Sequence, residues 1–166
     1  MLEIQRFFLN IKEEILYVNS HIWVVAIILG FLLVATYTDL KNMKIYHKFN
    51  MVFLLTRFAL IIVPFGISYQ WTHVFGGLIG FVFLLIPAMA LMHKMGGDIR
   101  FMGILGMYLG GYYTIVLLFI SCAIHFVYSM VTIFMLKREG KKTMVPFAPF
   151  FLIAYTMLTL LGFYVL

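Results

Sequence analysis

The chain has 166 residues, of which 64% are hydrophobic and only 11% are charged. That apolar share is far above the share found in soluble domains, so the composition excludes a soluble globular protein and predicts a chain that lives in a bilayer. The formal net charge of +6 is interpreted as contact with anionic lipid headgroups, and nucleic acid binding is not expected. The single cysteine, Cys122, excludes an internal disulfide and a cysteine-based metal cluster.

Residues 1–20 are predicted to form a first unit, an amphipathic helix lying on the membrane surface. Leu2, Phe7, Ile11 and Ile15 recur at helical spacing, and charged residues separate them. The same charges, and the lack of a small-residue cleavage site, argue against a cleaved signal peptide. The alternative is a frayed tail.

Residues 21–166 are predicted to form a second unit of six transmembrane helices. A helix needs about 20 residues to cross a bilayer, and a backbone in lipid must satisfy its own hydrogen bonds, which favours helices throughout. A turn at Gly110 and Gly111 divides an apolar stretch that is too long for one crossing. The fold class is therefore an all-α integral membrane protein, with spans at His21–Thr38, Phe49–Gly66, His73–Met92, Ile99–Gly111, Tyr112–Leu136 and Phe150–Leu166.

The distribution of basic residues predicts the orientation, because lysine and arginine accumulate in short cytoplasmic loops. The loops that follow the second and fourth spans, residues 64–72 and 109–113, carry no charge. We therefore expect a multi-pass protein of the cytoplasmic membrane with both termini outside. The three basic loops, placed in the cytoplasm, contain Lys41, Lys44 and Lys48; Lys94 and Arg100; and Lys137, Arg138, Lys141 and Lys142.

Two aspartates, Asp39 and Asp98, are the only acidic residues between Ile15 and Arg138. A charged group near hydrocarbon costs a few kcal/mol, so an acid in such a chain is a candidate for function. Both follow or precede apolar runs, and both fall on the predicted cytoplasmic side. Two helix ends could therefore bring them together.

Paired carboxyl groups suit proton-transfer chemistry. Like-charge repulsion and desolvation raise one proton affinity, so a close pair shares one proton and contains both an acid and a base. The ionised member can take a proton from water while the neutral member donates to a peptide carbonyl oxygen. The sequence does not assign these two roles. In the alternative reading, Asp98 only caps its helix and Asp39 only ends the first span.

Three segments resemble one known family. The run from Asp39 through Ile45 to His47 looks like the first aspartate motif of type IV prepilin peptidases. The run Gly96-Gly97-Asp98-Ile99-Arg100-Phe101 is similar to the GxGD motif of that family, and Val145-Pro146-Phe147-Ala148-Pro149-Phe150 resembles the segment that introduces its last span. The order of the three segments matches the family and covers nearly the whole chain.

The chain departs from the family pattern at four positions. Tyr46 and His47 stand where the family usually has proline and then asparagine or aspartate, Met95 replaces the first glycine of GxGD, and Arg100 stands where lysine is usual. None of these changes removes a group that must exchange protons. The larger family members carry a cytoplasmic domain with paired cysteines, and the chain has no such pair. It therefore resembles the short, peptidase-only forms and the archaeal preflagellin peptidases.

The resemblance implies a membrane aspartic endopeptidase that cuts prepilin-like precursors on the cytoplasmic side, after a glycine that closes a basic leader. Asp39 and Asp98 would be its catalytic pair, without a metal or organic cofactor. We further expect Gly96 and Gly97 to flank the scissile strand, and Lys41, Lys44 or Arg100 to receive a substrate carboxylate. The alternatives are a non-catalytic membrane scaffold and a small transporter or channel subunit.

Other residues of the predicted spans and loops lead to expectations about burial, packing and metal binding. Arg57 lies midway in the second predicted span, where it must snorkel, pair with an acid or face a cavity. Gly76, Gly77 and Gly80 offer a small helix face for close packing. His47 and His93 lack the spacing of a metal site.

Overall fold

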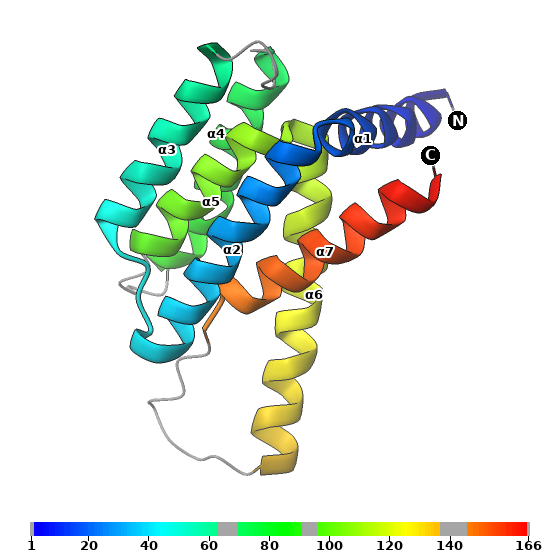
Figure 1. Ribbon diagram of the computed structural model, residues 1–166. Helices are drawn as coiled ribbons and strands as arrows, with labels where there is room; N and C mark the ends of the chain where they lie inside the picture. The colour runs from blue at the N-terminus through cyan, green and yellow to red at the C-terminus, as the bar shows by residue number, and fades with distance from the viewer. Residues whose placement is uncertain (1, 63–69, 91–95, 137–145, 166) are drawn as a thin grey trace.

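A computed structural model describes residues 2–62, 70–90, 96–136 and 146–165 of the chain. These residues form helices and contain no strand, so the prediction of an all-α protein is confirmed for them. Figure 1 shows the helices in chain order: α1 (Leu2–Ser20), α2 (Ile22–Asn42), α3 (His47–Ile62), α4 (Trp71–Ala90), α5 (Gly96–Leu109), α6 (Gly111–Leu136) and α7 (Ala148–Val165).

Three of these helices are long and apolar enough to cross a membrane: α2, α4 and α6. The apolar part of α7 is shorter, and α3 and α5 have only 16 and 14 residues. At a rise of about 1.5 Å per residue, α5 is about 21 Å long, less than the roughly 30 Å of a hydrocarbon core. The six predicted crossings therefore remain an expectation.

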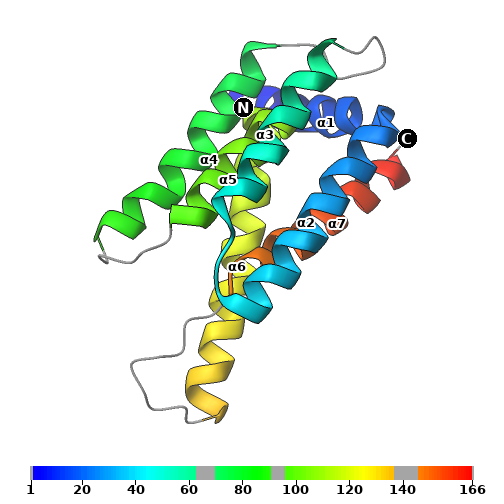
Figure 2. The ribbon, with the colours of Figure 1, turned by 60° about the vertical axis from the view of Figure 1, so that its left-hand side comes forward.

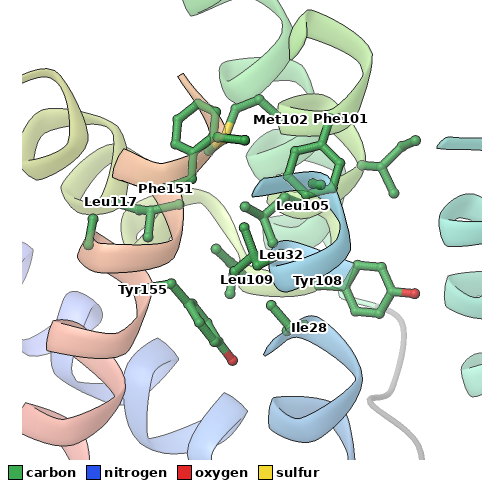
Figure 3. Close-up of a cluster of buried hydrophobic side chains, with 14 of the residues drawn as sticks. Ile28, Leu32, Phe101, Met102, Leu105, Tyr108, Leu109, Leu117, Phe151 and Tyr155 are labelled. Carbon is green, nitrogen blue, oxygen red and sulfur yellow. The ribbon is translucent and has the colours of Figure 1, made fainter. Parts of the chain in front are cut away.

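The short helix α5 is the centre of the bundle. Nine of its 14 residues are buried, and their side chains point in all directions around the helix. A helix that is apolar all round is expected to be enclosed by other helices. Figure 3 shows Phe101, Leu105 and Tyr108 of α5 in one buried cluster with Leu32 of α2 and Phe151 of α7.

Helices α4 and α5 approach closely because glycines face each other. A Cβ atom on Gly76 would overlap the carbonyl oxygen of Gly106, and one on Gly80 would lie 2.6 Å from the carbonyl oxygen of Met102. The predicted small face of α4 is therefore confirmed as a packing surface. The predicted turn is confirmed as well, since Gly110 has a φ of 93° and separates α5 from α6.

Helix α1 crosses one end of the bundle at a steep angle to the other helices (Figures 1 and 2). Its second half is fastened by two polar contacts. The backbone N–H of Tyr113 donates to Glu14 Oε2 at 2.8 Å, and Asn19 Nδ2 donates to the carbonyl oxygen of Thr159 at 3.1 Å. The predicted helix is therefore confirmed, whereas its position at a membrane surface stays a prediction.

Arg57 of α3 lies inside the bundle and is only 1% exposed. Its Nε donates to the carbonyl oxygen of Met107 at 2.8 Å, and its guanidinium carbon lies 5.6 Å from the centre of the Tyr108 ring. These contacts tie α3 to α5 near the end of the bundle that α1 crosses.

Several residues of the orientation and motif predictions lie outside the described residues. They are His93, Lys94, Met95, Lys137, Arg138, Lys141, Lys142 and Val145, together with most of the uncharged loop 64–72.

Candidate functional site

Asp39 lies in the last turn of α2, which continues past the predicted end at Thr38. The helix stops because Met43 adopts a left-handed conformation, with a φ of 52°, and its N–H donates to the carbonyl oxygen of Asp39. Glycine is the usual residue at this capping position, since a side chain is strained there. The Asp39 side chain is only 3% exposed.

The carboxylate of Asp39 faces the first residue of α7. The backbone N–H of Ala148 donates to Asp39 Oδ2 at 3.0 Å, and Ala148 is fully buried. The N-terminus of a helix carries unpaired N–H groups and a partial positive charge, which stabilises a nearby negative charge. The start of α7 therefore supports Asp39 directly, through the N–H of Ala148.

Asp98 lies in the first turn of α5, as the glycines before it suggested, and it is half-buried. It precedes the predicted span Ile99–Gly111. Burial first, and the negative charge of Asp39 second, raise the pKa of Asp98 from its ordinary value of 3.8 to about 7. The negative charge of Asp39 thus acts on Asp98, whereas the sharing of one proton between the two carboxyl groups stays a prediction.

Backbone contacts hold the two aspartate segments together. The carbonyl oxygen of Ile45, in the turn after α2, lies against the bare Cα of Gly97, where a Cβ would come within 2.5 Å of it. Asn50 of α3 donates from Nδ2 to the carbonyl oxygen of Gly97 at 3.0 Å. Both contacts act on the residue before Asp98, so they set where its helix begins.

Asn50 was not singled out from the sequence. It is 2% exposed, and its Oδ1 has no hydrogen-bond partner among the described residues. The signal that could have found it is an amide placed inside an otherwise apolar predicted span. Buried amides of this kind usually bind backbone or a ligand.

The two basic candidates take different positions. Arg100 is exposed and its Nη1 lies 3.1 Å from Nδ1 of His47, so it stands near Asp98 at the start of α5. Lys41 is exposed as well, but its Nζ lies over the ring of Tyr37, 5.7 Å from its centre. Gly96 has open space around it, with no atom within 4 Å of an added Cβ.

An apolar groove with a volume of about 480 Å³ runs between α3, α4 and α5. His47, Asn50 and Arg100 line it along with apolar side chains such as Leu54, Leu78 and Phe81. The polar residues thus lie beside the start of α5, while the rest of the lining suits a hydrocarbon or helical surface.

The described residues contain no group of three or more histidine, cysteine, aspartate or glutamate side chains that could hold a metal ion. The arrangement of Asp39 and Asp98 offers chemistry of another kind. One carboxylate is stabilised by a helix N-terminus and the other has a raised proton affinity, and such a pair can accept and donate protons at the same time.

Comparison with known proteins identifies a family for the part of the chain that holds both aspartates. Residues 26–130 match the model of the type IV leader peptidase family, a range that includes both aspartates and more than half of the chain. Neither the curated proteins nor the solved structures gave a significant match. On the family match, the chain belongs to the type IV leader peptidase family.

Proposed function

We propose that the chain is a membrane-embedded aspartic endopeptidase that removes the basic leader from prepilin-like precursors, with Asp39 and Asp98 as its catalytic pair. The observation that carries the proposal is the placement of these two acids at adjoining helix ends, which Ile45 and Asn50 join through Gly97, in a chain of a leader peptidase family. They are also the only two acids between Ile15 and Arg138, where a charge near hydrocarbon costs free energy.

The two acids differ in surroundings, which suggests a role for each. Asp39 accepts the N–H of Ala148 at the start of α7, so it is the ionised member that takes a proton from the attacking water. Asp98, with a pKa of about 7, is the protonated member that donates to the peptide carbonyl oxygen. Water adds to the carbonyl carbon to give a tetrahedral diol. As the C–N bond breaks, the proton held by Asp39 passes to the leaving amine and one hydroxyl of the diol returns a proton to Asp98, which leaves a carboxylic acid and restores the pair.

The proposed substrate path follows the open side of the α5 start. The precursor strand runs along Gly96 and Gly97, where Gly96 leaves room for another backbone. The apolar helix of the precursor packs along the groove between α3, α4 and α5, and Arg100 receives a substrate carboxylate near its mouth. Lys41 is the second candidate for that carboxylate, on the α2 side.

The proposed topology places the aspartates on the cytoplasmic side of a six-crossing unit, residues 21–166, with α1 as an interfacial helix. Exposed Lys41, Lys44, Lys48 and Arg100 surround this end of the bundle, in keeping with the positive-inside bias. Both termini would then lie outside, at the end that α1 crosses.

A non-catalytic scaffold is the second candidate, because the bond from Ala148 to Asp39 also has a structural use. The peptidase and the scaffold functions are distinguished by incubating purified protein with a precursor that has a basic leader, a glycine and an apolar helix. A peptidase releases the leader, and either Asp39→Asn or Asp98→Asn abolishes release. Leader release that survives both changes rules out the aspartic mechanism, and no release by the wild type supports the scaffold.

A further inference from the structure

A polar cavity of about 410 Å³ lies where α1 meets α4, α5 and α6. It is lined by Glu13, Glu14, Tyr17, Gln70, His73 and Tyr112, among others. Leu109, the last residue of α5, also borders it, whereas Asp98 is in the first turn of that helix. At about 1.5 Å per residue the cavity is therefore roughly 16 Å along α5 from Asp98, and the proposed function makes no use of it.

Two side chains of this cavity have buried polar atoms without a hydrogen-bond partner among the described residues. His73 is 3% exposed, and neither of its ring nitrogens has a hydrogen-bond partner among the described residues. Glu14 uses Oε2 to accept the N–H of Tyr113, but its buried Oε1 has no partner in the same part of the chain. Each unsatisfied buried group destabilises the folded protein. A ligand that supplies both partners would remove that cost.

The cavity continues into an apolar groove. A second hollow, of about 340 Å³, lies between α4 and α6 and is lined by Phe75, Ile79 and Ile115. The two hollows share Glu14, Thr72 and Tyr112, so they are contiguous. The apolar side chains along this second hollow suit a hydrocarbon chain. The combined shape fits a molecule with a polar head and a hydrocarbon chain.

The position of the cavity fits a lipid headgroup. Trp23 and Trp71, in the first turns of α2 and α4, are 75% and 73% exposed. Tryptophan is enriched where a membrane meets water. Both helices start at the end of the bundle that α1 crosses (Figure 1), which places the cavity at headgroup depth.

The charges of the lining select the headgroup. Glu13 and Glu14 are acceptors without a lysine or arginine in the lining, and the Tyr17 and Tyr112 rings favour a cation. His73 has a ring nitrogen free to donate to an anion, and the positive charge of Arg57 acts on it from within the bundle. Acceptors for a cation therefore stand beside a donor for an anion.

We propose that this cavity and groove bind one phospholipid with a primary ammonium headgroup, of the ethanolamine type. Its ammonium donates to Glu14 and Glu13, its phosphate accepts from His73, and one acyl chain lies along α4 and α6. A choline headgroup carries no N–H to give to Glu14, and a glycerol headgroup has no positive charge. The site therefore prefers phosphatidylethanolamine over phosphatidylcholine and phosphatidylglycerol.

The test uses the delipidated full-length protein in detergent and three synthetic lipids with identical acyl chains. Binding is followed by native mass spectrometry and by the shift in melting temperature. We expect phosphatidylethanolamine to bind about tenfold more tightly than the other two, as one charge-assisted hydrogen bond predicts. Equal binding of the three lipids would overturn the proposal. Free phosphoethanolamine should bind far more weakly, and comparable binding would remove the groove from the site.

Two variants and a control assign the binding to these residues. Glu13→Gln should reduce the preference for phosphatidylethanolamine severalfold, and Ile115→Trp, which fills the groove, should weaken all three lipids. Glu3→Gln removes an exposed charge of the same helix outside the cavity and should change nothing. Melting temperatures without lipid show that each variant is folded. An unaltered preference in Glu13→Gln, or unaltered affinities for the three lipids in Ile115→Trp, would contradict the assignment.

Discussion

The carboxylate of Asp39 receives the backbone N–H of Ala148 at 3.0 Å, so the last turn of α2 and the first residue of α7 are joined by one buried hydrogen bond. Replacing Asp39 by alanine should leave that N–H unsatisfied and lower the free energy of unfolding by about 1–3 kcal/mol. Asp39→Asn keeps an acceptor oxygen and loses only the charge, which should cost about 0.3–1 kcal/mol. Thermal denaturation in detergent measures both.

Asp98 provides the matched comparison for this effect, because it lies at the start of its own helix and has a raised pKa. Asp98→Asn should abolish leader release but should not lower the melting temperature. If Asp98→Asn lowered the melting temperature as much as Asp39→Ala, the claim that Asp39 stabilises the fold and Asp98 does not would be wrong.

The protonation of Asp98 should change near neutral pH. Its pKa of about 7 means that a hydrophobic carbodiimide, which reacts with protonated carboxyl groups, should label it below pH 7 and progressively less above. In Asp39→Asn, the charge that contributes to this raised value is gone, so half-labelling should move to lower pH. Peptide mass spectrometry locates the label. An unshifted midpoint would mean that the two carboxyl groups are not coupled.

The raised pKa of Asp98 also determines how the stability of the protein changes with pH. The folded state holds a proton on Asp98 that the unfolded chain releases above about pH 3.8, its ordinary value. The contribution of Asp98 is therefore full below that pH and is lost as pH rises towards 7. Melting temperature should fall over this range more in the wild type than in Asp98→Asn.

Features that depend on a single helix were predictable from the sequence. Asp98 lies in the first turn of α5, directly after two glycines, and Gly110 ends α5 because only glycine easily adopts the φ of 93° found there. The extension of α2 through Asp39 was not predictable in the same way. It ends at Met43 in a left-handed conformation, which a methionine in a sequence does not signal.

Contacts between distant segments were beyond the sequence. The bond from Asn50 to Gly97 spans 47 residues, and the bond from Ala148 to Asp39 spans 109. The sequence predicted that two acids would meet, but only packing decides which backbone groups hold them. The short length of α5 has a similar origin, since α5 is enclosed by other helices and need not face lipid along its length.

The basic candidates should differ in their effect on processing. Arg100→Gln should raise the KM for precursor about threefold to tenfold, since it removes a charge beside Asp98 that attracts a substrate carboxylate. Lys41→Gln should have a smaller effect, because Lys41 lies over the Tyr37 ring. Lys12→Gln, an exposed lysine on α1, is the control at matched expression. Unchanged kinetics in the first two variants would remove both residues from the site.

Asn50 should act as a positioning residue for Asp98. Asn50→Leu removes the donor to the Gly97 carbonyl and also removes an unpartnered oxygen, so its cost in stability should be only about 1 kcal/mol. A small displacement of a reacting group can reduce turnover far more than this, and we expect kcat to fall about tenfold with little change in KM. Asn50→Gln should restore part of the rate.

Asn42→Leu is the control for this change, since the Asn42 amide is exposed and donates to the Tyr46 hydroxyl at 3.1 Å. It should leave kcat unaltered. If Asn50→Leu instead lost so much stability that unfolding accounted for the lower kcat, the role of Asn50 would be purely structural.

The glycine contact between α4 and α5 should be more sensitive than any exposed glycine. In Gly106→Ala the new methyl group would overlap the carbonyl oxygen of Gly76, which is backbone and cannot rotate away, so the two helices must separate. Overpacking of this kind typically costs about 1–3 kcal/mol. Gly30→Ala, in the exposed middle of α2 with no atom within 4 Å, should be neutral or gain up to about 1 kcal/mol from helix propensity. Because α5 carries Asp98, separation of α4 and α5 in Gly106→Ala should reduce both leader release and the melting temperature. Gly30→Ala should reduce neither. Equal melting temperatures for the two variants would contradict the close approach of α4 and α5.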